Sequence, residues 1–324
     1  MGADELEQLL QEFYVGSKGA AARIISMIER DAPGNREILK QLYLKSGQGY
    51  IVGITGPAGS GKSTLTDSLV KQLRQQNYQV GVVAVDPTSP FTGGALLGDR
   101  VRMGELALDP GVFIRSMGTR GNLGGLSWAA RDALVVLDAF GCDYLFVETV
   151  GAGQSQTDVS RVADTVIMVD VPGLGDDIQA AKAGIMEIGN IFVVNKADRG
   201  DADKLVRYLQ TTLELGQKDN DWQPPVLKTV AWKGTGVEEV LKAIMDHRRH
   251  LEQSGLLINQ RRKQLKEEVM LQVERLVQVR LCDDVLSEDV LSKVYSRELD
   301  PWTAAEKMMH HMLDSHKKAE NPGL

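Results

Sequence analysis

The glycine-rich segment GPAGSGKS at positions 56–63 constrains the fold of this chain more than any other feature. It fits the pattern G-x-x-x-x-G-K-[ST] and joins an apolar run, Tyr50–Thr55, to a helical pattern over Ser63–Gln76. A strand, a glycine-rich turn and a helix in this order present backbone N–H groups and the positive end of the helix to a phosphate group. The segment therefore predicts a phosphate-binding loop (P-loop) and a nucleotide site.

The side chains of this loop have separate expected roles. Lys62 would reach the β- and γ-phosphate oxygens, and the Ser63 hydroxyl would bind Mg²⁺. A plain glycine-rich turn is the alternative, but the pattern and its context agree on the nucleotide site. The residues expected to contact the nucleotide here are Gly56, Ala58, Gly59, Ser60, Gly61, Lys62, Ser63 and Thr64.

Short apolar runs alternate with helical patterns over the central part of the chain. After Tyr50–Thr55, the predicted strands are Val80–Val85, Val112–Arg115, Tyr144–Val147, Thr165–Val169, Ile191–Val194 and Val226–Val230. Some of them are separated by further helical patterns, over Leu126–Phe140, Asp177–Ile188 and Ala202–Leu215. This alternation predicts an α/β fold with a doubly wound, mostly parallel sheet that helices cover on both faces. Ligands of such sheets bind beyond the carboxyl ends of the strands.

The chain divides into three predicted regions. Amphipathic patterns predict a helical N-terminal segment over residues 1–48, then the P-loop domain over 49–255 and a helical C-terminal region over 256–324. An apolar stripe on the C-terminal helix consists of Leu265, Val269, Val273, Leu276 and Val277. Two interpretations of this stripe remain open, packing on its own domain and dimerisation.

The tetrapeptide Asn195-Lys196-Ala197-Asp198 indicates which base the site binds. It follows the run Ile191–Val194 and so lies at the carboxyl end of a predicted strand. A carboxylate there accepts hydrogen bonds from guanine N1–H and the exocyclic amine, two donors that adenine does not offer in that arrangement. Because an unpaired buried carboxylate is costly, the motif predicts GTP over ATP.

Three acidic residues are candidates for the metal site. Asp86 and Glu148 end the predicted strands Val80–Val85 and Tyr144–Val147, and their tips are expected near the P-loop. Asp99 lies in a glycine-rich loop that would close over the γ-phosphate. For each of the three, a solvated loop acid or a helix cap is the alternative.

The segment Glu-Thr-Val-Gly at 148–151 resembles the Asp-x-x-Gly of GTP-hydrolysing switches, in which a water-positioning glutamine follows. Here Ala152 takes the next position, and the nearest glutamine is Gln154. We therefore predict slow intrinsic hydrolysis, with Lys62, Asp99, Glu148 and Gln154 as the candidate catalytic residues. Arg120, in the loop TRGNLGG, is expected to contact a phosphate or a partner, with a structural loop as the alternative.

The composition disfavours several classes of protein. The net charge is −7 and no long basic block is present, so a nucleic-acid groove has little support. Cys142 and Cys282 are too few for a disulfide framework or a thiolate metal site, and they suit a reducing cytoplasm. The N-terminus lacks the pattern of a secretory signal, and no apolar run approaches the roughly 18 residues that span a membrane.

The chain also resembles the MeaB/ArgK-type P-loop GTPases, which are G-protein chaperones of adenosylcobalamin-dependent acyl-CoA mutases such as methylmalonyl-CoA mutase. The resemblance covers nearly the whole chain, in family order and spacing, and rests on the segments GITGPAGSGKST, VVAVDPTSP, GALLGDRVRM, TRGNLGGLS, ETVGAGQSQTDV, VPGLGDDIQAAKAG and NKAD. It implies a homodimer that dimerises through its helical C-terminal region. It also implies a GTPase that gates delivery of adenosylcobalamin to the mutase and helps to eject damaged cofactor.

The resemblance implies roles for individual residues as well. Those expected at Mg²⁺ and the γ-phosphate are Lys62, Ser63, Asp86, Asp99 and Glu148. Those expected at the guanine are Asn195, Lys196 and Asp198. Asp176, Asp177 and Lys182, in the segment VPGLGDDIQAAKAG, fall in an implied switch that contacts the mutase.

The chain departs from the family pattern at one position, and two other functions are alternatives. Val230 stands where the family has serine, although the backbone N–H of Ala231 would still reach guanine O6. A nickel-insertion GTPase metallochaperone would need a Cys/His-rich metal site, which the scattered cysteines and histidines do not suggest. A kinase or transport ATPase, as in older labels of ArgK-like proteins, is disfavoured by the NKAD motif.

Overall fold

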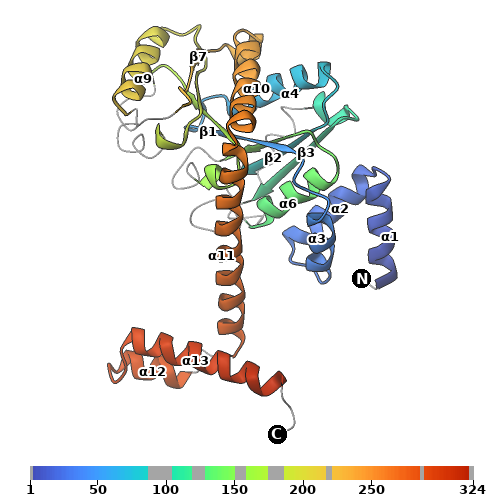
Figure 1. Ribbon diagram of the computed structural model, residues 1–324, viewed down its shortest axis with the longest axis vertical. Coiled ribbons are helices and arrows are strands. Elements are labelled where there is room, and N and C mark those ends of the chain that lie inside the picture. Colours follow the sequence, from blue (N-terminus) through green and yellow to red (C-terminus); the bar gives the residue numbers. More distant parts are fainter. Residues whose placement is uncertain are drawn as a thin grey trace. The chain divides into compact units, whose positions relative to one another are not determined.

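The computed structural model describes residues 3–86, 104–118, 128–149, 158–173, 186–216, 221–284 and 288–320. The chain forms two compact units, Met1–Gln260 and Arg261–Leu324. The first unit contains the sheet and the nucleotide-binding motifs, and the second is helical (Figure 1).

A seven-stranded sheet forms the centre of the first unit (Figure 1). Its strands are β1 (Tyr50–Thr55), β2 (Val80–Asp86), β3 (Val112–Gly118), β4 (Tyr144–Glu148), β5 (Thr165–Asp170), β6 (Ile191–Val194) and β7 (Val226–Lys228). The order is β3-β2-β4-β1-β5-β6-β7, and every pair of neighbours is parallel. The predicted doubly wound parallel sheet is therefore confirmed. The P-loop follows β1, which lies at the centre between β4 and β5.

Helices cover both faces of the sheet. Successive residues of each strand point to opposite faces, and apolar side chains on both faces form a core with helices. The first unit contains α1 (Ala3–Tyr14), α2 (Lys18–Glu29), α3 (Asn35–Tyr43), α4 (Lys62–Gln75), α6 (Trp128–Ala139), α9 (Ala202–Gly216) and α10 (Val237–Ser254). In β4, Tyr144 and Phe146 pack in one core with α4 and α10. Leu145 and Val147 pack in the opposite core with α6 and the N-terminal helices α1–α3.

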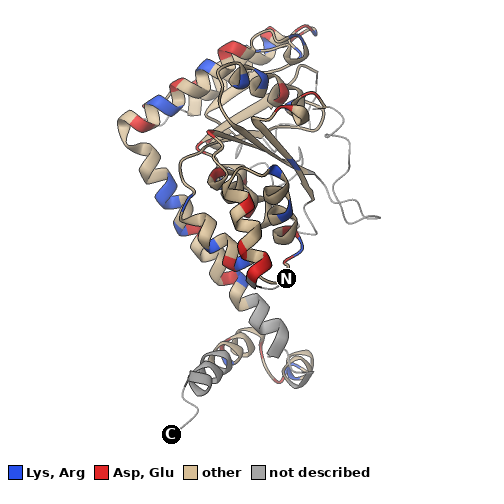
Figure 2. Ribbon diagram, turned by 90° about the vertical axis from the view of Figure 1, so that its right-hand side faces the viewer, with Lys and Arg blue, Asp and Glu red and all other residues tan. Residues whose placement is uncertain are grey.

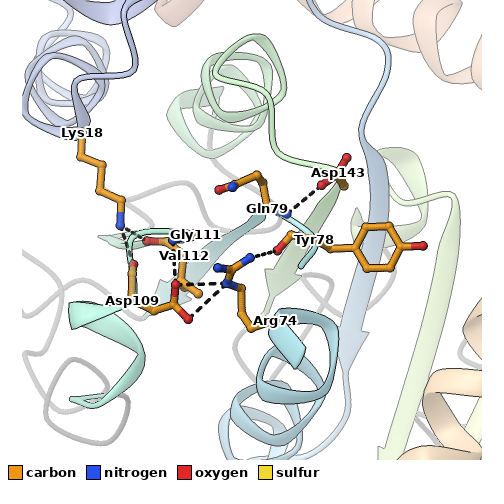
Figure 3. A network of polar contacts seen from close by, with 8 residues as sticks. All are labelled: Lys18, Arg74, Tyr78, Gln79, Asp109, Gly111, Val112 and Asp143. Atoms are coloured by element: carbon orange, nitrogen blue, oxygen red, sulfur yellow. Dashed lines mark hydrogen bonds and ion pairs between the residues drawn. The ribbon is translucent and has the colours of Figure 1, made fainter. Parts of the chain in front are cut away.

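A polar network ties the N-terminal helices to the amino edge of the sheet (Figure 3). The ammonium group of Lys18, at the start of α2, donates to the backbone carbonyls of Asp109 and Val112, both at 2.7 Å. Arg74 pairs with the Asp109 carboxylate at 3.1 Å and donates to the Tyr78 carbonyl. Burial lowers the pKa of Lys18, whereas the hydrogen bond from Arg74 lowers the pKa of Asp109.

Charged residues of both signs lie along the helices, and the strands carry few of them (Figure 2). This distribution fits a sheet whose two faces are both covered, since ionised side chains are costly to bury. Among the described residues, none of the helices is apolar over a stretch long enough to cross a lipid bilayer.

Helix α11 (Leu256–Asp284) begins in the first unit and forms the start of the second. The second unit also contains α12 (Glu288–Tyr295) and α13 (Pro301–Glu320). Asp300 caps α13, where its carboxylate accepts from the backbone N–H of Thr303 at 2.9 Å. The predicted apolar stripe of α11 is open to solvent in the single chain, with Val269 61% and Val273 47% exposed.

Candidate functional site

The P-loop turns sharply between β1 and α4, and two of its glycines have no tolerable substitute. Gly56 has φ 140° and Gly61 has φ 90°, in the left-handed half of backbone space that glycine adopts most easily. A Cβ at Gly56 would collide with the Val169 carbonyl of β5. One at Gly61 would collide with the side-chain amide of Asn195. The loop sequence therefore allows close contact with β5 and with the NKAD motif.

The Lys62 side chain lies back over the loop it follows. Its Nζ donates to the carbonyls of Gly56 at 3.0 Å and Pro57 at 3.1 Å. Nucleotide phosphate oxygens are better acceptors than neutral carbonyls, because charge-assisted hydrogen bonds are roughly twice as strong. Lys62 is thus held at the loop in a position from which it can exchange carbonyls for phosphate.

Glu148 reaches the P-loop from the neighbouring strand. It ends β4 opposite Ile54 of β1, and its side chain is only 4% exposed. Ser63 Oγ donates to Glu148 Oε2 at 3.0 Å, so the structure brings these two predicted metal ligands together. The Thr66 hydroxyl also donates to this carboxylate.

Asp86 is the last residue of β2, the strand beside β4. Ala84 pairs with Glu148, which places the Asp86 backbone two residues further along at the same edge of the sheet. The side chain of Asp86 lies outside the described part of the structure. Six other predicted site residues also lie outside the described residues, namely Asp99, Arg120, Gln154, Asp176, Asp177 and Lys182.

The donor set at the P-loop fits a magnesium ion. Mg²⁺ prefers hard oxygen ligands and is usually bound by one or two carboxylates together with phosphates and waters. Ser63 and Glu148 supply a hydroxyl and a carboxylate that already contact each other. A nickel site would use His and Cys side chains, and the described residues contain no group of three or more His, Cys, Asp or Glu arranged to hold a metal.

Asn195 joins three segments at the end of the site where the base is expected. The residue is 2% exposed, and its Nδ2 donates to the Ser60 carbonyl at 2.9 Å. Its Oδ1 accepts from Thr229 Oγ1 at 3.0 Å and from the Ala231 backbone N–H at 3.1 Å. Because Ala231 uses its N–H on Asn195 here, contact with guanine O6 requires that this hydrogen bond be shared or exchanged.

The rest of the NKAD motif follows as a strained turn. Lys196 has φ 55°, unusual for a residue with a Cβ, and its Nζ donates to the Gly59 carbonyl at 2.6 Å. The Asp198 carboxylate is 38% exposed and lies 3.9 Å from Lys233 Nζ. The strained turn thus leaves the Asp198 carboxylate accessible, beside a cation that a bound base would have to displace or accommodate.

Three residues of this site were missed by the sequence analysis. Thr66 lies three positions after Ser63, and this spacing on a helix is a signal that the two hydroxyls share a face. Thr229 directly precedes the loop that begins with Val230-Ala231, and its hydrogen bond to Asn195 holds that loop against the NKAD motif. Lys233 reaches Asp198 through tertiary packing, for which the sequence gives no signal.

Comparison with known proteins finds relatives that are described as GTPases. The family described as "Methylmalonyl Co-A mutase-associated GTPase MeaB" matches residues 21–286. A putative GTPase of Pyrococcus horikoshii is 48% identical over 95% of this chain and 98% of its own length. The mitochondrial methylmalonic aciduria type A homolog of Mus musculus is 31% identical over 82% of this chain and 69% of its own.

A solved structure shows the same fold. It is that of a protein described as LAO/AO transport system kinase, which is 25% identical and superposes with a TM-score of 0.72. The match covers 97% of this chain and 99% of the other.

Proposed function

We propose a function for this chain, which belongs to the family of methylmalonyl-CoA mutase-associated GTPases and hydrolyses GTP. In this proposal it is the G-protein chaperone of an adenosylcobalamin-dependent acyl-CoA mutase. The observation that carries the proposal is the junction at Asn195, which links the P-loop to the NKAD motif. This junction couples the phosphate and base ends of one nucleotide site. The description of the family names methylmalonyl-CoA mutase, and the name of the mouse relative refers to methylmalonic aciduria, which supports a mutase as the client.

Binding of GTP exchanges hydrogen bonds that Lys62 makes within the loop for hydrogen bonds to phosphate. Phosphate oxygens replace the carbonyls of Gly56 and Pro57 on Lys62, and the amide-rich loop from Gly56 to Thr64 surrounds them. Guanine N1–H and the exocyclic amine donate to Asp198, whose carboxylate is accessible. Asn195, Lys196 and Ala231 hold the loops that frame the base.

The metal ligands in this proposal are Ser63 and Glu148, with Asp86 and Asp99 as further ligands. A bound Mg²⁺ supplies positive charge that stabilises the phosphates as negative charge shifts toward the leaving group. Lys62 contributes its ammonium group to the same oxygens. Ala152 offers no side chain to orient the attacking water, so turnover by the chain alone is slow, and Gln154 reaches the water only after a partner docks.

The mutase supplies what the isolated site lacks. We assign Arg120, Asp176, Asp177 and Lys182 to the segments that report the nucleotide state to the mutase. Hydrolysis then times the delivery of intact adenosylcobalamin and the ejection of damaged cofactor. The open stripe around Val269 and Val273 on α11 favours dimerisation, because apolar residues in such numbers on one helix face usually contact a partner.

The experiment that tests this proposal measures phosphate release from GTP by the purified chain, with and without candidate acyl-CoA mutases. We expect the cognate mutase to accelerate turnover, since groups supplied in trans raise such rates by about 10³–10⁵-fold in other GTPases. Lys62→Ala controls for contaminating hydrolysis. A rate of GTP hydrolysis that is the same with and without each candidate mutase would contradict the proposal. A phosphorylated small-molecule product would favour a kinase.

A further inference from the structure

Two hydroxyl groups of one helix hold the carboxylate of Glu148, and each holds a different oxygen. Ser63 Oγ donates to Oε2 at 3.0 Å, and the Thr66 hydroxyl donates to Oε1. Both hydroxyls come from α4, one turn apart, so they meet the strand end from the same helix face. This pair of contacts therefore restrains the orientation of the carboxylate at both of its oxygens.

The Thr66 hydroxyl has two acceptors within reach and one proton to give. Its Oγ1 also lies 3.0 Å from the Lys62 carbonyl, the ordinary back-bond of a threonine inside a helix. A carboxylate is the stronger acceptor, because a charge-assisted hydrogen bond outweighs a neutral one. Thr66 is fully buried, which shields this hydrogen bond from competing water.

The two hydroxyls differ in their relation to the metal. Ser63 lies in the P-loop and is itself the proposed ligand, so the ion sets its position once bound. Thr66 lies one turn further into α4, among the buried residues of the helix, and is not itself a proposed ligand, so we expect its contact with Glu148 to persist when the ion binds. The hydrogen bond from Thr66 holds Oε1 of Glu148, and the other oxygen, Oε2, then faces Ser63.

We propose that Thr66 is a positioning residue of the hydrolysis site, which holds the Glu148 carboxylate with Oε2 facing the Mg²⁺ position. Without this hydroxyl the carboxylate loses one donor in a buried site, and rotation toward other donors relieves the cost of the missing hydrogen bond. Oε2 then leaves the orientation that suits the metal. This inference rests on the proposed metal role of Ser63 and Glu148 and is independent of the mutase.

The test compares Thr66→Val with Thr66→Ser in the full chain. Binding of Mn²⁺ to the GDP complex, measured by electron paramagnetic resonance, reports the metal site without any turnover. We expect Thr66→Val to weaken Mn²⁺ binding by about 10-fold or more, the usual effect of removing a group that orients a metal ligand. Thr66→Ser keeps the hydroxyl and is expected to restore binding to within about twofold. Thr66→Ala is a second variant that removes the same hydroxyl.

Kinetics separate positioning from a structural effect. At low Mg²⁺, kcat of Thr66→Val falls, whereas KM for GTP and the kcat at saturating Mg²⁺ change little. The matched control is Thr165→Val, which removes a buried threonine hydroxyl at the amino edge of the sheet. That hydroxyl contacts the Tyr50 hydroxyl at 2.6 Å and His247 Nδ1 at 2.7 Å, so the control lowers stability and leaves Mn²⁺ affinity unchanged.

Three results would overturn the inference, and Glu148→Gln distinguishes the first two. Where Glu148→Gln weakens Mn²⁺ binding and Thr66→Val does not, Thr66 has no positioning role. Where neither change affects Mn²⁺ binding, the metal role of Glu148 itself is wrong. An equal loss in Thr66→Val and Thr165→Val would also reduce the effect to general stability and contradict the inference.

Discussion

Replacement of Asn195 by alanine tests how the site is assembled, because this side chain joins the P-loop, the NKAD turn and the Val230-Ala231 loop. Three hydrogen bonds are lost, at 2.9, 3.0 and 3.1 Å. The partners Ser60, Thr229 and Ala231 are each at most 2% exposed. A buried group left unsatisfied costs about 1–3 kcal/mol, and water entering the vacated space offsets part of this. We expect the free energy of unfolding to fall by about 3–5 kcal/mol.

Urea unfolding of the nucleotide-free chain, followed by circular dichroism, measures this loss. Asn190→Ala is the matched control, since it removes one hydrogen bond, from the Val166 N–H to Asn190 Oδ1 at 2.8 Å. The control is expected to cost about 1–2 kcal/mol. Asn195→Asp keeps an oxygen for Thr229 and Ala231 but turns a second one toward the Ser60 carbonyl, so it should also be strongly destabilising. A loss below about 1 kcal/mol for Asn195→Ala would refute the reasoning.

Three further predictions concern base selection, pH and the N-terminal segment. Asp198→Asn should weaken GTP binding by about 100-fold or more. The same variant should favour xanthosine triphosphate, because the O2 carbonyl of xanthine accepts a hydrogen bond from the new amide. Calorimetric titration with each nucleotide measures both effects. Burial and the charge of His250 lower the pKa of His247 to about 4. An unfolded histidine is protonated near pH 6.5, so the free energy of unfolding should fall by about 3 kcal/mol between pH 6.5 and 4, and urea unfolding of His247→Gln should lack that slope. Lys18→Met loses two hydrogen bonds of 2.7 Å (Figure 3) and should cost about 2 kcal/mol in the same assay, whereas an unchanged midpoint would contradict that network.

The strands were predictable because both faces of the sheet are buried and the strand sequences are continuously apolar. The predicted β1 and β6 have the observed bounds, and the predicted helical patterns over Leu126–Phe140 and Ala202–Leu215 correspond to α6 and α9. The predicted helix over Asp177–Ile188 lies mostly outside the described residues. The last strand is shorter than predicted and ends at Lys228, because Val230 pairs with Thr235 in an antiparallel bridge. That local pairing closes the Val230-Ala231 loop and has no signal in the apolar pattern.

The local motifs of the site were also predictable, whereas its cross-links were not. Lys62 and Asn195 belong to short patterns whose spacing reflects the chemistry of phosphate and base. Thr66 contacts Glu148 across 82 positions of sequence, and Thr229 contacts Asn195 across 34. Such contacts depend on how a helix and a loop pack on the sheet, and a single sequence does not specify that packing.

The N-terminal segment shows the same boundary between pattern and packing. Its amphipathic patterns predicted the helices, but they gave no indication that Ile24 and Ile25 of α2 would share a core with α6. The two boundaries between the three predicted regions stay predictions. The exposed stripe on α11 favours the dimer that we propose, and a measurement of the oligomeric state tests it.

The measurement that tests the proposed function most directly is the loading of a cobalamin-free acyl-CoA mutase with adenosylcobalamin, followed by absorbance. It compares the mutase alone, with this chain and GTP, and with Lys62→Ala and GTP. We expect the chain to change the rate of loading in a manner that depends on GTP, and Lys62→Ala to remove this dependence. Identical loading in all three mixtures would contradict it.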